Sequence, residues 1–106
     1  DMLMPDAVAH HVACHSDPRV VKSSGYLEPV NADGFSIGGR IPGRLFPSGD
    51  YKAHFFERGP GAYRSAFTSG NAWSRSFLEK VLPLPENDLI GADGYLTAID
   101  ALFGRI

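Results

Sequence analysis

The sequence predicts an α/β protein in which helices pack on a small mixed sheet beside a long loop rich in Gly and Pro. Three observations support this class. Apolar residues recur at helical spacing near both ends of the chain, and a strand-like apolar run begins at Val20. Twelve of the 20 Gly and Pro residues lie between Gly25 and Gly61. Because Gly raises the cost of ordering and Pro lacks a backbone donor, this stretch cannot form long regular elements.

Size and charge exclude several classes of function. The 106 residues correspond to about one small domain, and the formal net charge is -2. That charge provides no electrostatic footprint for nucleic acid. The lone Cys14 excludes an internal disulfide framework, and no apolar run approaches the ~20 residues that span a bilayer. We therefore expect a cytoplasmic protein that does not bind nucleic acid.

The first half predicts one helix, one strand and the long loop. A helix is expected after Pro5, which suits a first turn, and it ends before Pro18 because a residue preceding proline avoids the helical region. Residues 20–30 read as a strand, with Gly25 as a bulge. The loop is expected at about 31–66, ordered by its large apolar side chains.

The second half predicts a short strand and two helices. The strand is expected around residues 66–68. Ser74 caps a helix that Pro83 ends, and its apolar stripe is Phe77, Leu78, Val81 and Leu82. The last helix is expected over residues 92–102, with Gly104 just beyond its end.

The residues 103–106 resemble the opening of a further strand. Two visible strands cannot cover three amphipathic helices, because each apolar face needs a partner layer. Either further strands lie within the Gly-rich loop or the chain is part of something larger. The terminal residues favour the second alternative, so we expect residues 1–106 to form a single partial domain. An exposed apolar sheet face would then favour a homodimer.

Three groups of residues could carry chemistry. His11 and His15, four positions apart, could bind zinc together with a third ligand, or could lie on the solvent-exposed face of a helix. The block Thr68-Ser69-Gly70-Asn71-Ala72-Trp73-Ser74-Arg75 could bind an anion at a helix N-terminus, or could be a helix cap with Trp73 in the core. Asp93, near a helix start, could serve as a general base or as an N-cap.

Five segments together resemble family 2 glycosyltransferases, which have the GT-A fold. They are residues 1–6, Gly25-Tyr26-Leu27, the block from Thr68 to Arg75, Leu82-Pro83-Leu84-Pro85-Glu86, and Gly91-Ala92-Asp93-Gly94-Tyr95-Leu96. The resemblance covers essentially the whole chain and implies the C-terminal, acceptor-side half of that family's catalytic domain. It implies a metal-dependent inverting transfer of a sugar from a nucleotide-sugar donor to a hydroxyl acceptor.

The resemblance also implies roles for individual residues. Asp1 matches the last acidic residue of the Asp-x-Asp motif, which holds Mg²⁺ or Mn²⁺ on the donor diphosphate. Asp93 matches the catalytic base, although Ala92 stands where the family usually has Glu. Residues that match the substrate-lining positions of the cleft are Ser69, Gly70, Asn71, Trp73 and Arg75. The family's nucleotide-binding part precedes the acidic motif, so the isolated chain is expected to be incomplete.

Two further readings stay open. The chain could be a non-catalytic module that binds carbohydrate or protein through aromatic platforms such as Trp73, Tyr51 or Tyr63. It could instead be a fragment that binds zinc through its histidines. Whether the parent protein lies at the periphery of a membrane also stays open.

Overall fold

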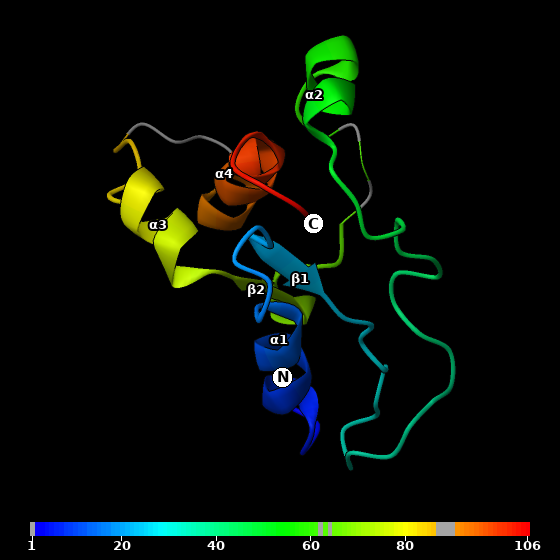
Figure 1. Cartoon of the computed structure of the whole chain (residues 1–106). Helices are drawn as coiled ribbons and strands as arrows, with labels where there is room; N and C mark the ends of the chain where they lie inside the picture. The colour runs from blue at the N-terminus through cyan, green and yellow to red at the C-terminus, as the bar shows by residue number, and fades with distance from the viewer. Residues whose placement is uncertain (1, 62, 64, 87–90) are drawn as a thin grey trace.

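A computed structural model describes residues 2–61, 63, 65–86 and 91–106 of the chain (Figure 1). These residues form a mixed α/β globule of four α-helices, two short strands and two 3₁₀ helices. In chain order the elements are α1 (Ala7–Cys14), β1 (Lys22–Ser24), α2 (Lys52–Arg58), η1 (Thr68–Gly70), β2 (Asn71–Trp73), α3 (Arg75–Val81), α4 (Ala92–Ile99) and η2 (Asp100–Leu102). No helix in these ranges is long and apolar enough to cross a membrane.

The two strands form an antiparallel sheet that separates α1 from α4 (Figure 1). Lys22 pairs with Trp73 and Ser24 pairs with Asn71. Because side chains alternate along a strand, these four residues share one face, and Ser23 points to the other. The first face meets η2 and the second meets α1, as the contacts below show. The sheet is antiparallel rather than mixed, so that part of the expected fold class is wrong.

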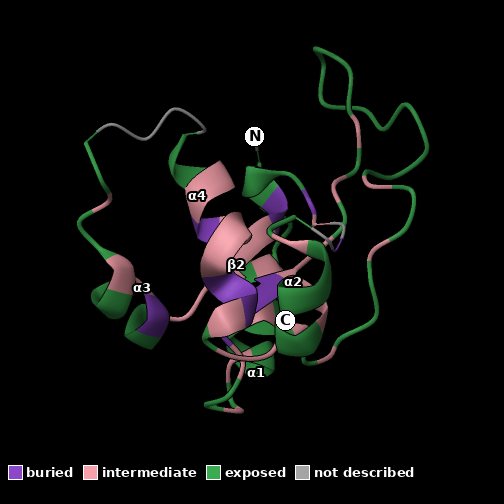
Figure 2. Cartoon of the chain, turned by 90° about the horizontal axis from the view of Figure 1, so that it is seen from above, coloured by how far each residue is buried: buried purple, intermediate pink, exposed green. Residues whose placement is uncertain are grey.

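The apolar core lies where α3 and α4 meet the first sheet face. Its buried centre consists of Val21, Phe77 and Leu96, and Trp73 packs against it. The Phe77 ring also meets the Phe103 ring edge-on, with centroids 5.2 Å apart. Figure 2 shows the buried segments gathered at the sheet and helices, while the long loop is exposed along most of its length.

The expected strand over residues 20–30 is wrong beyond its first part. β1 covers only Lys22–Ser24, and isolated bridges replace the ladder elsewhere. One of these bridges is parallel and joins Val20 to Arg105, where the sequence predicted a further strand. After Ser24, the Gly25 N–H donates to the Gly70 carbonyl at 2.7 Å, which continues the register of the two strands by one residue.

The loop predicted at 31–66 contains a helix that the sequence analysis missed. α2 spans Lys52–Arg58 and ends at Gly59, whose φ of 84° suits glycine. Its seven residues stand between two clusters of Gly and Pro, which concealed the helical spacing. The strand expected at 66–68 is also wrong, because η1 occupies Thr68–Gly70 and β2 begins at Asn71.

The two helices with clear end signals are confirmed. Ser74 caps α3, and its hydroxyl accepts the Phe77 N–H at 3.3 Å. α4 begins at Ala92, and η2 continues it to Leu102, which matches the predicted range. The first helix is confirmed as α1. Capping residues and apolar periodicity are local signals, which is why these three predictions succeeded.

Replacing Gly104 by Ala should destabilise the fold by about 1–3 kcal/mol, because a Cβ there would overlap the Arg19 carbonyl oxygen and lie 2.7 Å from Cγ1 of Val21. The midpoint of urea unfolding measures the change. Gly43→Ala is the matched control, since nothing lies within 4 Å of its added Cβ. Equal midpoints for Gly104→Ala and the parent would show that residues 104 and 19 do not pack as described.

Candidate functional site

A pocket of about 390 Å³ lies between the segment that leads into β2 and the first two turns of α4. It is lined by Pro60, Gly61, Ser65, Ala66, Phe67, Thr68, Asn71, Asp93, Gly94, Thr97 and Ala98. Two residues of the predicted site, Asn71 and Asp93, therefore meet in one cavity although they come from different elements. The polar groups on its wall are hydroxyls, one amide and one carboxylate, and the described lining contains no cation.

Asp93 is the only ionisable group on the described wall of this pocket. It lies in the first turn of α4, where the helix dipole favours a carboxylate, and it is exposed. The Thr68 hydroxyl donates a hydrogen bond to its Oδ2. This hydrogen bond, with smaller help from the backbone N–H groups of Gly94 and Asp93, lowers the pKa of the carboxyl. Asp93 is therefore ionised at neutral pH and can only accept hydrogen bonds.

Asn71 is held rigidly in the opposite wall. Its Oδ1 accepts the Ser24 hydroxyl at 2.8 Å and faces the Ser65 hydroxyl at 3.4 Å. Its Nδ2 donates to the Ala66 carbonyl at 3.0 Å. The amide thus holds the segment 66–71 in shape through its hydrogen bond to the Ala66 carbonyl.

The other predicted substrate-binding residues do not line the described part of this pocket. Gly70 is buried, and a Cβ added to it would lie 2.7 Å from the Gly25 carbonyl oxygen, so close backbone packing explains the glycine. Trp73 is half-buried on the core, while Ser69 and Arg75 are exposed. These positions match the capping interpretation of the block from Thr68 to Arg75.

The metal ligands suggested by the sequence do not form a site in the described ranges. Asp1 lies outside the described residues. His11 and His15 converge on one serine hydroxyl instead of a third ligand, because Ser23 Oγ lies 2.7 Å from His11 Nδ1 and 3.2 Å from His15 Nε2. Among the residues with described positions, no group of three or more His, Cys, Asp or Glu could hold a metal ion.

A buried charged cluster behind the pocket was missed by the sequence analysis. Lys22 and Asp100 have fully buried side chains, and the Lys22 ammonium lies 3.2 Å from Asp100 Oδ2. The same ammonium lies 2.5 Å from the Ser65 hydroxyl and 3.2 Å from the Tyr63 hydroxyl, which in turn donates to Asp100 Oδ1. The Tyr63 and Trp73 rings flank it, with centroids 5.1 and 5.8 Å from Lys22 Nζ.

Burial governs the acid–base behaviour of this cluster. Desolvation lowers the pKa of Lys22 and raises the pKa of Asp100, and it outweighs their mutual attraction. Desolvation also raises the pKa of Tyr63, with a further contribution from the Asp100 charge. The ammonium donates to the Tyr63 and Ser65 hydroxyls, whereas Asp100 Oδ2 forms an ion pair with it but has no hydrogen-bond partner among the described residues. Losing one partner of such a pair typically costs about 3–5 kcal/mol.

A signal for this cluster does exist in the sequence. Lys22 follows Val20 and Val21 inside an apolar strand pattern, and Asp100 interrupts the apolar stripe of the last helix. Each is a charge at a position where the pattern calls for an apolar residue. Charged residues at such positions are buried only when they are paired. Lys22 and Asp100 are therefore each other's expected partner.

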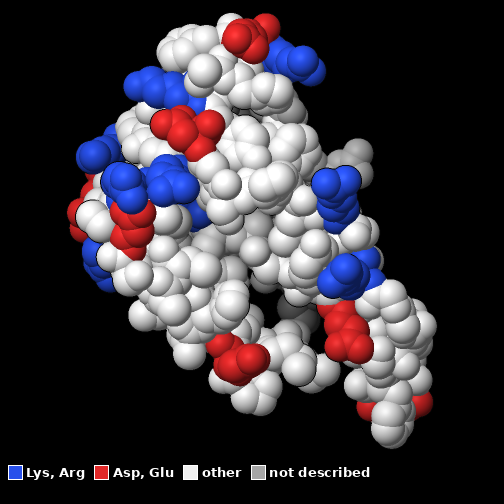
Figure 3. Space-filling model, turned by 45° about the vertical axis from the view of Figure 1, so that its right-hand side comes forward, with Lys and Arg blue, Asp and Glu red and all other residues white. Residues whose placement is uncertain are grey.

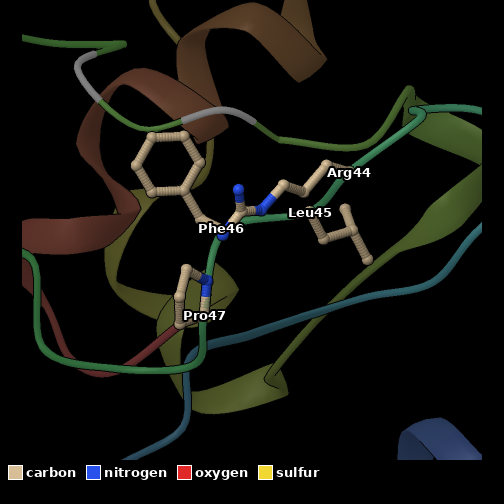
Figure 4. Close-up of a pocket in the computed structure, with 4 residues that line it drawn as sticks. All are labelled: Arg44, Leu45, Phe46 and Pro47. Carbon is tan, nitrogen blue, oxygen red and sulfur yellow. The ribbon is translucent and has the colours of Figure 1, made fainter.

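Two further pockets share no lining residue with the Asp93 pocket. One, of about 370 Å³, is formed by the loop residues Arg44, Leu45, Phe46 and Pro47 (Figure 4). The other, of about 400 Å³, opens beside α1 and β1 and includes Ser23 and Arg105 in its lining.

One of the aromatic residues suggested as a platform for carbohydrate is not exposed. Tyr63 is buried, and its ring stacks on the Tyr51 ring with centroids 5.3 Å apart.

Replacing Thr68 by Val should raise the pKa of Asp93, because the hydrogen bond to the ionised carboxylate is lost. A ¹³C NMR titration of the Asp93 carboxyl measures this change. Since the folded-state pKa is lowered, the contact stabilises the fold above the ordinary aspartate pKa, and this contribution disappears as the pH falls through the folded-state value. Thr97→Val, at the same pocket, should leave the titration unchanged, and an unchanged titration in Thr68→Val would refute the contact.

No protein-family model, curated protein or solved structure matches this chain. The function is therefore inferred from the motifs in the sequence and from the geometry around Asp93.

Proposed function

We propose that the chain forms the acceptor side of a family 2-like, inverting glycosyltransferase that transfers a sugar from a nucleotide-sugar to a hydroxyl group. The observation that carries this proposal is the ionised Asp93 carboxylate, which accepts a hydrogen bond from Thr68. It lies on the wall of a pocket of about 390 Å³ that Asn71 also lines. The family resemblance places its catalytic base at the same residue.

The geometry suits a base that acts on an alcohol. A carboxylate has two oxygens with about four acceptor sites, so Asp93 can accept an incoming hydroxyl while it keeps the hydrogen bond from Thr68. Asn71, Ser65 and Thr97 also line the pocket and add polar groups to its wall. Such a wall of neutral polar groups fits an uncharged polyol.

The reaction proceeds with one proton transfer and one displacement. The acceptor hydroxyl donates its proton to Asp93 as its oxygen forms a bond to the anomeric carbon. The bond between that carbon and the diphosphate oxygen breaks, the diphosphate leaves with the electron pair, and attack from the opposite side inverts the configuration. Because Thr68 lowers the basicity of Asp93, the proton moves late, when the new C–O bond has made the hydroxyl more acidic.

The nucleotide-sugar site and the divalent cation are included in the proposal because the resemblance to family 2 glycosyltransferases implies them. Asp1, the proposed ligand of Mg²⁺ or Mn²⁺, lies outside the described residues, and the remaining described residues provide no ligand cluster. The nucleotide-binding part is proposed to be supplied by polypeptide outside these 106 residues. Figure 3 shows positive and negative side chains interspersed on the face it displays, without a broad cationic surface for the nucleotide.

The expected dimer through an exposed sheet also remains a proposal. Lys22 and Ser23 of β1 are buried, and the strands carry no exposed large apolar side chain among the described residues. Such side chains lie instead on residues 2–4, on α1 and along the loop, for example Val12 and Phe35.

Replacing Asp93 by Asn should reduce transfer by about 10²–10⁴-fold, because the amide cannot accept the proton. The assay measures release of nucleoside diphosphate by the natural polypeptide that contains these residues, with UDP- and GDP-sugars and Mg²⁺ or Mn²⁺. The exposed loop variant Asp33→Asn is the control and should behave like the parent.

Near-parental kcat in Asp93→Asn would overturn the assignment of the base. If the parent polypeptide shows no cation-dependent affinity for any nucleotide-sugar, the glycosyltransferase proposal fails. That result would favour the non-catalytic carbohydrate- or protein-binding module.

A further inference from the structure

The Asp93 pocket has two walls that come from separate parts of the chain. One wall is the segment 65–71, which is held together by the Asn71 amide and by the hydrogen bond from the Gly70 N–H to the Phe67 carbonyl at 2.8 Å. The other wall is α4. At the pocket surface, the contact between Thr68 and Asp93 joins these two walls.

Lys22 joins the same two walls in the interior, behind the pocket. Its ammonium contacts Ser65 of the first wall at 2.5 Å. It also contacts Asp100 at 3.2 Å, and Asp100 follows Asp93 by seven residues, about two helical turns, along α4 and η2. Lys22 itself belongs to β1 and has no exposed surface, so its position is fixed by the sheet.

We propose that Lys22 is a positioning residue of the Asp93 site, which sets the separation of the two walls and thereby holds Thr68 against the Asp93 carboxylate. Its importance for catalysis rests on the proposed function, but the positioning itself does not. Tyr63 completes the arrangement, because its hydroxyl accepts from Lys22 and donates to Asp100.

The chemistry of the cluster supports a role beyond stability. A buried ion pair is often no more stabilising than an apolar pair of the same volume, because desolvation of both charges offsets their attraction. An ammonium, however, directs its donors toward several oxygens at once. Here those oxygens belong to Tyr63 and Ser65 on one side and to Asp100 on the other. An apolar side chain at position 22 would fill the space without fixing these directions.

The test uses a variant that keeps the volume and removes the charges. In Lys22→Met/Asp100→Leu both charged partners are replaced together, so no unpaired charge is left buried. We expect the variant to fold and the pKa of Asp93, followed by ¹³C NMR, to rise toward the ordinary aspartate value. In a Thr68→Val background the same double replacement should cause no additional rise, because both changes act through one contact.

Two further variants separate positioning from general loss of stability. Ser65→Ala removes the link from Lys22 to the first wall but keeps the ion pair, and it should also raise the pKa of Asp93. Gly104→Ala strains the packing against Arg19 and Val21, which do not line the pocket, and it should lower the unfolding midpoint without moving that pKa. If the charge-free variant fails to fold, Ser65→Ala alone decides the question.

The proposal is overturned if Asp93 titrates as in the parent in the folded charge-free variant or, where that variant does not fold, in Ser65→Ala. The proposal is also overturned if Lys22→Met/Asp100→Leu raises the pKa of Asp93 as much in the Thr68→Val background as in the parent. Because the readout is a titration and not a rate, this result is independent of whether Asp93→Asn retains transfer activity. The failure of the positioning role and the failure of the glycosyltransferase proposal are therefore distinguishable.

Discussion

Lys22, the first residue of β1, brings a positive charge into the interior, where Asp100, Tyr63 and Ser65 surround it. This contact matters because the apolar core is small: among the residues with described positions, its buried centre consists of Val21, Phe77 and Leu96. Strands of three residues each cannot by themselves hold a helix on either face. The ion pair ties β1 to η2 and the segment before β2, and the remaining elements pack around that junction.

The parts of the fold that the sequence predicted are those with local causes. The helix that Ser74 caps and the one carrying Asp93 follow from capping residues and apolar spacing, and both are present. The pairing of β1 with β2 is not local, because about 50 residues separate Lys22 from Trp73. Periodicity within one segment carries no information about such a partner. For the same reason the strand was expected to be longer than it is.

The candidate site was predictable only in part. Asp93 and Asn71 were selected from motifs, and the structure brings them to one pocket. The sequence could not separate them from Trp73 and Arg75, since all fall within similar motifs but only tertiary packing decides which face a cavity. Thr68 belonged to a candidate block but was not among the predicted substrate-binding residues, and Lys22 was missed. The importance of each depends on a contact with Asp93 or Asp100, far along the chain.

We propose that Lys22 makes the segment 65–71 and the α4–η2 unit one cooperative structure. Native-state amide hydrogen exchange measures the opening free energy of each segment separately. We expect the protected amides of the two segments to open with the same free energy in the parent, and with different free energies once Lys22 and Asp100 are replaced by Met and Leu. Independent opening of the two segments in the parent would show that Lys22 does not couple them.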